Sequence, residues 1–246
     1  MKFSVSYVTN IGRARENNQD SLLVQDVLLN KESMDAPSEL ELEAETAWFI
    51  VADGMGGEDL GEVASGETLR VLAQHLPELE SPEAFPPLLD LAVTRLDEIA
   101  RHNRVRLGTT LAGIIVTPQG NLAFNVGDCR VYQVEDGLLN RLTRDHSLLE
   151  AAIAAGQPPE SVSHNIVTAA VMGGEVDVLQ VYTHVIDCRP GDTYLICCDG
   201  LWGALSTEEM QTAIADLNPK EATTALLAAA LAKSDDNISA IIVRIS

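Results

Sequence analysis

Trp48 to Ala52 form a short, unbroken apolar run that stops at Asp53 and is followed by the glycine-rich stretch Gly54–Gly57. An apolar run of this length without polar alternation indicates a strand that is buried on both faces. Such a strand requires further layers of structure on each side. The glycines cannot comfortably continue a strand or a helix, so the strand ends at a sharp turn. This segment therefore places a carboxylate where a buried strand meets a turn.

The predicted strands come in runs that are separated by helical stretches. Apolar runs and alternation predict strands at Phe3–Tyr7, Ser21–Val27, Trp48–Ala52, Thr109–Val116, Leu122–Val126, Arg130–Glu135, Val181–Ile186, Thr193–Cys198 and Ile238–Ile245. Helical spacing predicts helices from Glu62, over residues 84–104 and 147–155, and after the caps Ser206 and Asn218. Because strict strand–helix alternation is missing, we expect antiparallel sheets with helices on their outer faces, which is an α+β fold. Since no repeat or linker divides the 246 residues, we expect one domain over residues 1–246.

Two of the segments that connect the predicted strands carry their own sequence signals. Asp136-Gly137 is a strong signal for a tight hairpin turn. Residues 29–46 are rich in acid and poor in aromatic side chains. We expect this segment to be a solvated loop or hairpin extension that is weakly ordered.

The charge and composition exclude several classes of partner. The formal net charge is −21, which argues against nucleic-acid binding and against an anionic membrane surface. No apolar stretch approaches the roughly 20 residues of a membrane span, and the start lacks the apolar run of a signal peptide. The four cysteines form no Cys-x-x-Cys pair. We therefore expect reduced, buried thiols in a cytoplasmic protein, with no nucleic-acid or membrane partner.

Four aspartates each stand where an apolar strand meets a turn, namely Asp53, Asp128, Asp199 and Asp236. Any one of them alone indicates only a turn. Several together could converge on one edge of a sandwich, where they would repel one another unless a cation compensated their charge. The sequence leaves this convergence open.

Four blocks in order resemble the metal-dependent protein phosphatases of type 2C, the PPM family, in their bacterial form. These blocks are Gly12–Ser21; Ala52–Gly57 with Gly61–Ser65; Gly108–Thr110 with Asn125–Arg130 and Leu142–Ser147; and Cys198–Trp202 with Asp235–Ser239. The resemblance spans nearly the whole chain. It implies a four-layer αββα sandwich, in which two antiparallel sheets are flanked by helix pairs.

The resemblance also implies roles for individual residues. Asp53 would bridge two Mn²⁺ or Mg²⁺ ions, and the Gly54 carbonyl would be a further ligand. Asp199 and Asp236 would complete the first metal site, and Asp20 would lie beside the second. Arg15 would hold the substrate phosphate with two guanidinium donors. A hydroxide shared by the two ions would attack phosphorus, so no side-chain nucleophile is required.

Some positions depart from the family pattern. Gln19 stands where many relatives carry a glutamate that assists the second metal, so that site would bind more weakly or through water. Met55 replaces the histidine that is thought to protonate the leaving group in eukaryotic relatives. Asp128 matches a ligand of a third metal, whose acidic partner in the flap over residues 152–165 would be Glu160. His146 is expected to make a structural hydrogen bond, with a proton relay as the alternative.

The resemblance implies a serine/threonine phosphatase that acts on phosphoserine and phosphothreonine proteins and opposes a bacterial Ser/Thr kinase in signal transduction. The alternative is a low-activity pseudophosphatase that binds phosphoproteins as a regulator. A phosphatase of a stress-response switch is a third possibility, which only substrate tests would separate from the first. The excess of acidic residues predicts that basic residues near the phosphorylated side chain are preferred.

Overall fold

The computed structural model describes residues 1–55, 57–158, 162–163, 166–174, 179–215 and 217–246. Two sheets form its centre, and every strand pairing in the described part of the chain is antiparallel. The first sheet has the order β4 (Ser38–Glu43), β1 (Lys2–Asn10), β13 (Ile238–Ile245), β12 (Thr193–Cys197), β8 (Arg130–Glu135) and β9 (Leu138–Arg141). The second has the order β11 (Tyr182–Ile186), β7 (Gly120–Val126), β6 (Leu107–Thr117), β5 (Ala47–Met55), β2 (Asp20–Val24) and β3 (Val27–Asn30), with β10 (Val171–Gly173) beside β6.

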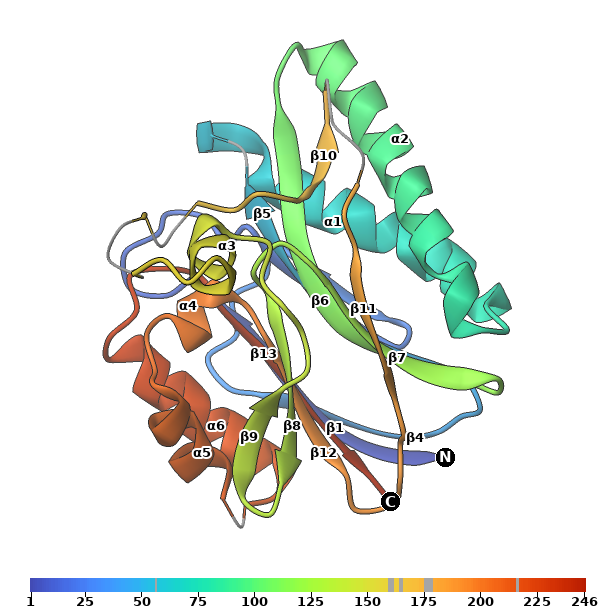
Figure 1. Ribbon diagram of the computed structural model, residues 1–246, viewed down its shortest axis with the longest axis vertical. Helices are drawn as coiled ribbons and strands as arrows, with labels where there is room; N and C mark the ends of the chain where they lie inside the picture. Colours follow the sequence, from blue (N-terminus) through green and yellow to red (C-terminus); the bar gives the residue numbers. More distant parts are fainter. Residues whose placement is uncertain (56, 159–161, 164–165, 175–178, 216) are drawn as a thin grey trace.

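Helices cover the outer face of each sheet, as Figure 1 shows. α1 (Gly57–His75) and α2 (Pro86–Asn103) pack on the second sheet, and the short 3₁₀ turns Leu76–Glu78 and Pro82–Ala84 join them. α5 (Thr207–Ile214) and α6 (Pro219–Leu231) pack on the first sheet. α3 (Leu148–Ala154) and α4 (Asp199–Trp202) lie at the end of the sandwich away from the two chain termini. This arrangement confirms the predicted αββα sandwich.

Three apolar layers hold the sheets and helices together. The middle layer lies between the sheets and includes Phe3, Phe49 and Ile241, which are all buried. The alternation of strand side chains sends Cys198 into this layer and its neighbour Cys197 into the outer layer under α5 and α6. These two neighbouring thiols therefore point to opposite faces of the first sheet. All four cysteines are free, although Cys188 is half-buried and not buried as expected.

Local sequence signals account for several element boundaries. Ser206 and Asn218 each open a helix through a reciprocal capping box, in which the cap side chain accepts from the third backbone N–H and the glutamate there reaches back. Asp136 and Gly137 both have positive φ angles, 51° and 76°, and join β8 to β9. A turn with two positive φ angles matches the right-handed twist of the strands. These capping and turn predictions are confirmed.

The expectation for residues 29–46 was wrong in part. Ser38–Glu43 form β4, which pairs with β1 along the edge of the first sheet. Leu40 and Leu42 pack against the middle apolar layer, whereas the glutamates that alternate with them along the strand are exposed. The strand period of two was present in the sequence but was hidden by the high acid content. The predicted strand over Ser21–Val27 is likewise the first part of a hairpin, because the chain turns at Gln25 with a φ of 52°.

None of the described helices has the length and apolar character that a membrane span would need. The expectation of one domain over residues 1–246 stays a prediction.

Candidate functional site

A pocket of about 230 Å³ lies between the two sheets and brings together residues from distant parts of the chain. The residues lining it are Arg15, Gln19, Asp53, Gly54, Met55, Thr110, Asp128, Val167, Asp199, Asp236 and Asn237. The four aspartates that stand at strand ends in the sequence are all among them. The convergence that the sequence left open is therefore present in the fold. Asp20 is not part of this lining and is buried.

The second sheet supplies Asp53 and Asp20 from adjacent strands. Asp20 on β2 is the register partner of Asp53 on β5, and Asp53 is in turn opposite Thr110 on β6. Next in the chain, the Gly54 N–H donates to the Gln19 carbonyl at 3.2 Å. A Cβ at Gly54 would lie 2.1 Å from the Gly61 carbonyl oxygen at the start of α1. Glycine is required here because helix and strand backbones approach too closely for a side chain.

The first sheet supplies Asp199 and Asp236 from the ends of β12 and β13. Asp199 is the first residue of α4, and Asp236 lies two positions before the start of β13. A Cβ at Gly200 would lie 1.9 Å from the Asn237 carbonyl oxygen, so glycine permits the two chain segments to touch. These close backbone approaches bring the two carboxylates to the same pocket wall.

Asn237 joins the two sheets at the pocket, which the sequence did not reveal. Its side-chain amide donates to the carbonyls of Ile11 and Asn17, at 2.9 and 3.0 Å. Its Oδ1 accepts from the Gln19 backbone N–H at 2.9 Å. Asn237 therefore fixes the chain on both sides of Arg15 relative to β13. The only sequence signal was its position within the Asp-Asn-Ile segment before a strand.

Arg15 reaches the pocket from the loop that follows β1. Its Nη2 donates to Asp236 Oδ2 at 2.7 Å, and half of its side chain is exposed. Gly12 turns this loop with a φ of +74°, and a Cβ there would lie 2.2 Å from the Asp236 carbonyl oxygen. Arg13 points away and donates to the carbonyls of Ala232 and Lys233 at the end of α6. The Arg15 guanidinium is thus the cation placed at the mouth of the pocket.

A cluster of aromatic and charged side chains supports the backbone at Asp128. Trp202 Nε1 donates to the Asp128 carbonyl at 2.9 Å. The Arg130 guanidinium stacks on the Trp202 ring at 3.3 Å from its centroid and forms a bidentate ion pair with Asp145. Because Trp202 lies on the same helix as Asp199, this cluster ties the Asp128 loop to α4. Arg130, Asp145 and Trp202 all belong to the motif blocks of the sequence, but the sequence did not indicate that they form a cluster.

His146 makes the structural hydrogen bond that was expected. Its Nδ1 accepts from the Gly127 N–H at 3.1 Å, and its own backbone N–H donates to the Gly127 carbonyl at 2.8 Å. Burial lowers the pKa of the imidazole, which favours the neutral form that can accept this bond. His146 therefore shapes the turn that carries Asp128.

The carboxylates of the site are crowded and poorly solvated. Burial, followed by the charge of Asp199, raises the pKa of Asp53 well above its ordinary value. Burial and the charge of Asp236 also raise the pKa of Asp199. Burial raises the pKa of both Asp20 and Asp128 to about 7. Asp20 Oδ2 is moreover buried and has no hydrogen-bond partner among the described residues. Such a group of carboxylates is one that a bound cation would stabilise.

The donor set fits hard divalent cations. Carboxylate oxygens and a nearby backbone carbonyl are the ligands that Mg²⁺ and Mn²⁺ prefer. Within the described ranges, no three His, Cys, Asp or Glu side chains are arranged so that together they could hold one metal ion. Mg²⁺ commonly keeps several waters and takes only one or two carboxylates, so a partial protein shell suits it. Gly56 and Glu160, the latter the expected partner of Asp128 at a third metal, lie outside the described residues.

Comparisons with known proteins agree with this fold. The family model described as protein phosphatase 2C matches residues 35–233. The serine/threonine phosphatase Stp of Listeria monocytogenes is 30% identical over 217 residues, which cover 82% of this chain and 79% of that protein. The serine/threonine phosphatase structure of S. agalactiae is 25% identical, covers 99% of this chain and 100% of that chain, and has a TM-score of 0.81. The catalytic domain of PstP, solved with two manganese ions, is 24% identical over all of both chains, with a TM-score of 0.78.

Proposed function

The chain belongs to the protein phosphatase 2C family, and we propose that it is a metal-dependent phosphatase of phosphoserine and phosphothreonine proteins that opposes a bacterial Ser/Thr kinase. The observation that carries this proposal is the pocket in which Asp53, Asp199 and Asp236 converge beside the Arg15 guanidinium. Carboxylates for cations and a guanidinium for phosphate are the two binding functions that phosphoryl transfer requires.

Asp53, between the two sheets, would contact both Mn²⁺ or Mg²⁺ ions, with the Gly54 carbonyl as a further ligand. Asp199 and Asp236 would hold the first ion, and Asp20 would lie beside the second. When bound, the two ions supply an activated water at neutral pH and balance negative charge on the phosphoryl oxygens. The raised pKa values of Asp53 and Asp199 support this assignment, because cations would restore their ionised forms.

Arg15 would bind the phosphate and orient it for in-line attack. Its side chain is half exposed at the pocket mouth, so a phosphorylated side chain can reach it from solvent. The guanidinium now bonded to Asp236 has further N–H donors, which can pair with two phosphate oxygens. Attack of water on phosphorus breaks the bond to the serine or threonine oxygen, which then takes a proton. Met55 lines the pocket and has no proton to give, so solvent would supply it.

Asp128 would be a ligand of a third ion. The chain would form one domain over residues 1–246. The free, largely buried cysteines support a reducing, cytoplasmic setting.

The experiment is hydrolysis of a phosphothreonine peptide with Mn²⁺, with Mg²⁺ and with chelator. Asp53→Asn should abolish metal-dependent turnover, because the variant loses the charge that both ions would share. Asp136→Asn is the matched control, since Asp136 is exposed in the β8–β9 turn and should leave turnover unchanged. Turnover that survives in chelator or in Asp53→Asn would contradict the two-ion proposal. A folded protein without turnover in either metal would favour the regulator that only binds phosphoproteins.

A further inference from the structure

The few basic residues of this chain are almost all neutralised within the molecule. The sequence has 16 Lys and Arg against 37 Asp and Glu. Thirteen of the 16 form an ion pair in the described part of the chain. Arg244 is held by hydrogen bonds to Thr193 and to the Leu217 carbonyl. Arg104 and Arg106 remain, and neither has an ion pair or side-chain hydrogen bond with another described residue.

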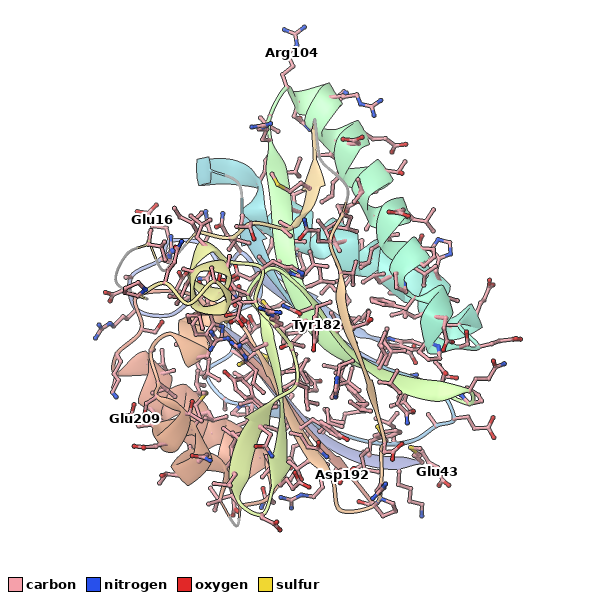
Figure 2. All side chains as sticks on the ribbon, viewed as in Figure 1. Glu16, Glu43, Arg104, Tyr182, Asp192 and Glu209 are labelled. Atoms are coloured by element: carbon pink, nitrogen blue, oxygen red, sulfur yellow. The ribbon has the colours of Figure 1, made fainter. Side chains whose placement is uncertain are left out.

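These two arginines belong to one exposed surface at the end of α2. We call residues 101–106 the basic tip, since they read Arg-His-Asn-Arg-Val-Arg and are all exposed. Arg104 adopts a left-handed conformation with φ 57° and ends α2, so the chain turns sharply there. Figure 2 shows Arg104 at the extremity of the molecule, with Glu43 and Asp192 at the opposite end. In a chain with a net charge of −21, two neighbouring arginines that pair with no acidic side chain among the described residues are a local reversal of charge.

β6 connects the basic tip to the pocket wall along the chain. Arg106 immediately precedes β6, and Thr110 further along that strand lines the pocket and is opposite Asp53. By the strand period of two, position 106 continues the row of Gly108 and Thr110. Four residues of strand span about 13 Å, so the tip begins about that far from the pocket wall.

We propose that the basic tip is a docking surface for an acidic segment of the phosphoprotein substrate. This inference rests on the proposed function and adds a rule for substrate selection. A peptide extended at about 3.3 Å per residue would place acidic side chains on the tip when they stand roughly four to seven residues from the phosphorylated one. Val105, which is 37% exposed between the two arginines, offers an apolar contact in the same place.

This rule differs from the one that the total charge predicts. The net charge of −21 repels any acidic peptide and would favour basic residues near the phosphothreonine. The basic tip favours acid only at a defined spacing, because charges separated by more than about 10 Å are largely screened at 0.1 M salt. Acid next to the phosphothreonine should therefore lower turnover, and acid at the longer spacing should raise it.

The test compares three kinds of phosphothreonine peptide. The first carries three glutamates at the longer spacing, the second carries three glutamates next to the phosphothreonine, and the third carries none. Separate peptides of the first two kinds place the glutamates before or after the phosphothreonine. For the wild type we expect kcat/KM to be about fivefold higher with distant glutamates than with none, through KM, because two exposed ion pairs have this order of effect. R104Q/R106Q should lose that preference and keep its turnover of the neutral peptide. K2Q/R189Q is the matched control, because it removes the same charge from exposed ion pairs elsewhere.

A second variant and a direct binding measurement complete the test. R104E/R106E should reverse the preference, so that lysines at the longer spacing lower KM. Binding of the unphosphorylated acidic peptide, followed by fluorescence anisotropy, should weaken in R104Q/R106Q and not in K2Q/R189Q. This binding does not depend on catalysis, so it separates a failure of the docking surface from a failure of the proposed function.

Three results would overturn the inference. The first is equal preference for distant glutamates in the wild type and R104Q/R106Q. The second is a clear loss of thermal stability in R104Q/R106Q, which would show that the arginines are used within the fold. The third is binding to vesicles containing phosphatidylserine that R104Q/R106Q abolishes, without any effect on acidic peptides, which would make the tip a membrane contact.

Discussion

Replacing Asp128 by asparagine should stabilise the metal-free protein, and more strongly at high pH than at low pH. Asp128 is only 7% exposed, and burial together with the charges of Asp199 and Asp145 raises the pKa of its carboxyl group to about 7 from the ordinary 3.8. The folded state therefore holds this proton more tightly than the unfolded chain does. For an acid with a raised pKa, stability is lost as the pH rises from about 4 to about 7 and stays low above that.

The size of the effect follows from the two pKa values. A tenfold change in a dissociation constant corresponds to about 1.4 kcal/mol. The difference between 3.8 and about 7 therefore costs the wild type about 4 kcal/mol at pH 8, and about 2 kcal/mol at pH 5. Asparagine has nearly the same shape and no charge, so it avoids this cost. Both values are upper limits, because water that enters the pocket reduces the penalty on the carboxylate.

The assay is urea unfolding in the presence of chelator at pH 5 and pH 8. Asp128→Asn should unfold at higher urea than the wild type at pH 8, with a smaller gain at pH 5. Asp136→Asn is the control, because this exposed turn position has a left-handed backbone that asparagine tolerates. An Asp128→Asn variant that is no more stable than the wild type at pH 8, or that gains equally at both pH values, would refute the reasoning. If Asp128 is a metal ligand, Mn²⁺ should then stabilise the wild type more than Asp128→Asn.

Two further predictions concern the support of the site. Gly12→Ala should lower the free energy of unfolding by about 2 kcal/mol or more, because it adds a clash with the Asp236 carbonyl to an unfavourable φ. Gly137→Ala has the same sign of φ but open space around it, so it should cost clearly less, and equal losses in urea unfolding would contradict the clash. Trp202→Phe keeps an aromatic ring under Arg130 but removes the donor to the Asp128 carbonyl, so it should cost about 1 kcal/mol. Unchanged stability in calorimetry would show that this hydrogen bond makes no net contribution.

Local rules in the sequence determined most elements of secondary structure. The capping boxes at Ser206 and Asn218, the Asp136-Gly137 turn and the apolar run before Asp53 are each decided by residues within a few positions of one another. The ordered motif blocks likewise carried the family, because their residues and spacing can be read along the chain. β4 was missed because its alternation of leucine and glutamate resembles a solvated acidic segment until β1 is placed beside it.

Only the tertiary structure decided which residues meet. Arg15 and Asp236 are 221 positions apart, and their ion pair depends on how the two sheets pack. The role of Asn237 in joining the sheets depends on the same packing, because its partners come from the loop after β1. The sequence shows an excess of acid over base, but it cannot show which arginines are neutralised. Among the described residues, Arg104 and Arg106 are distinguished from the other lysines and arginines only in three dimensions, because pairing depends on distance in space and not on position in the chain.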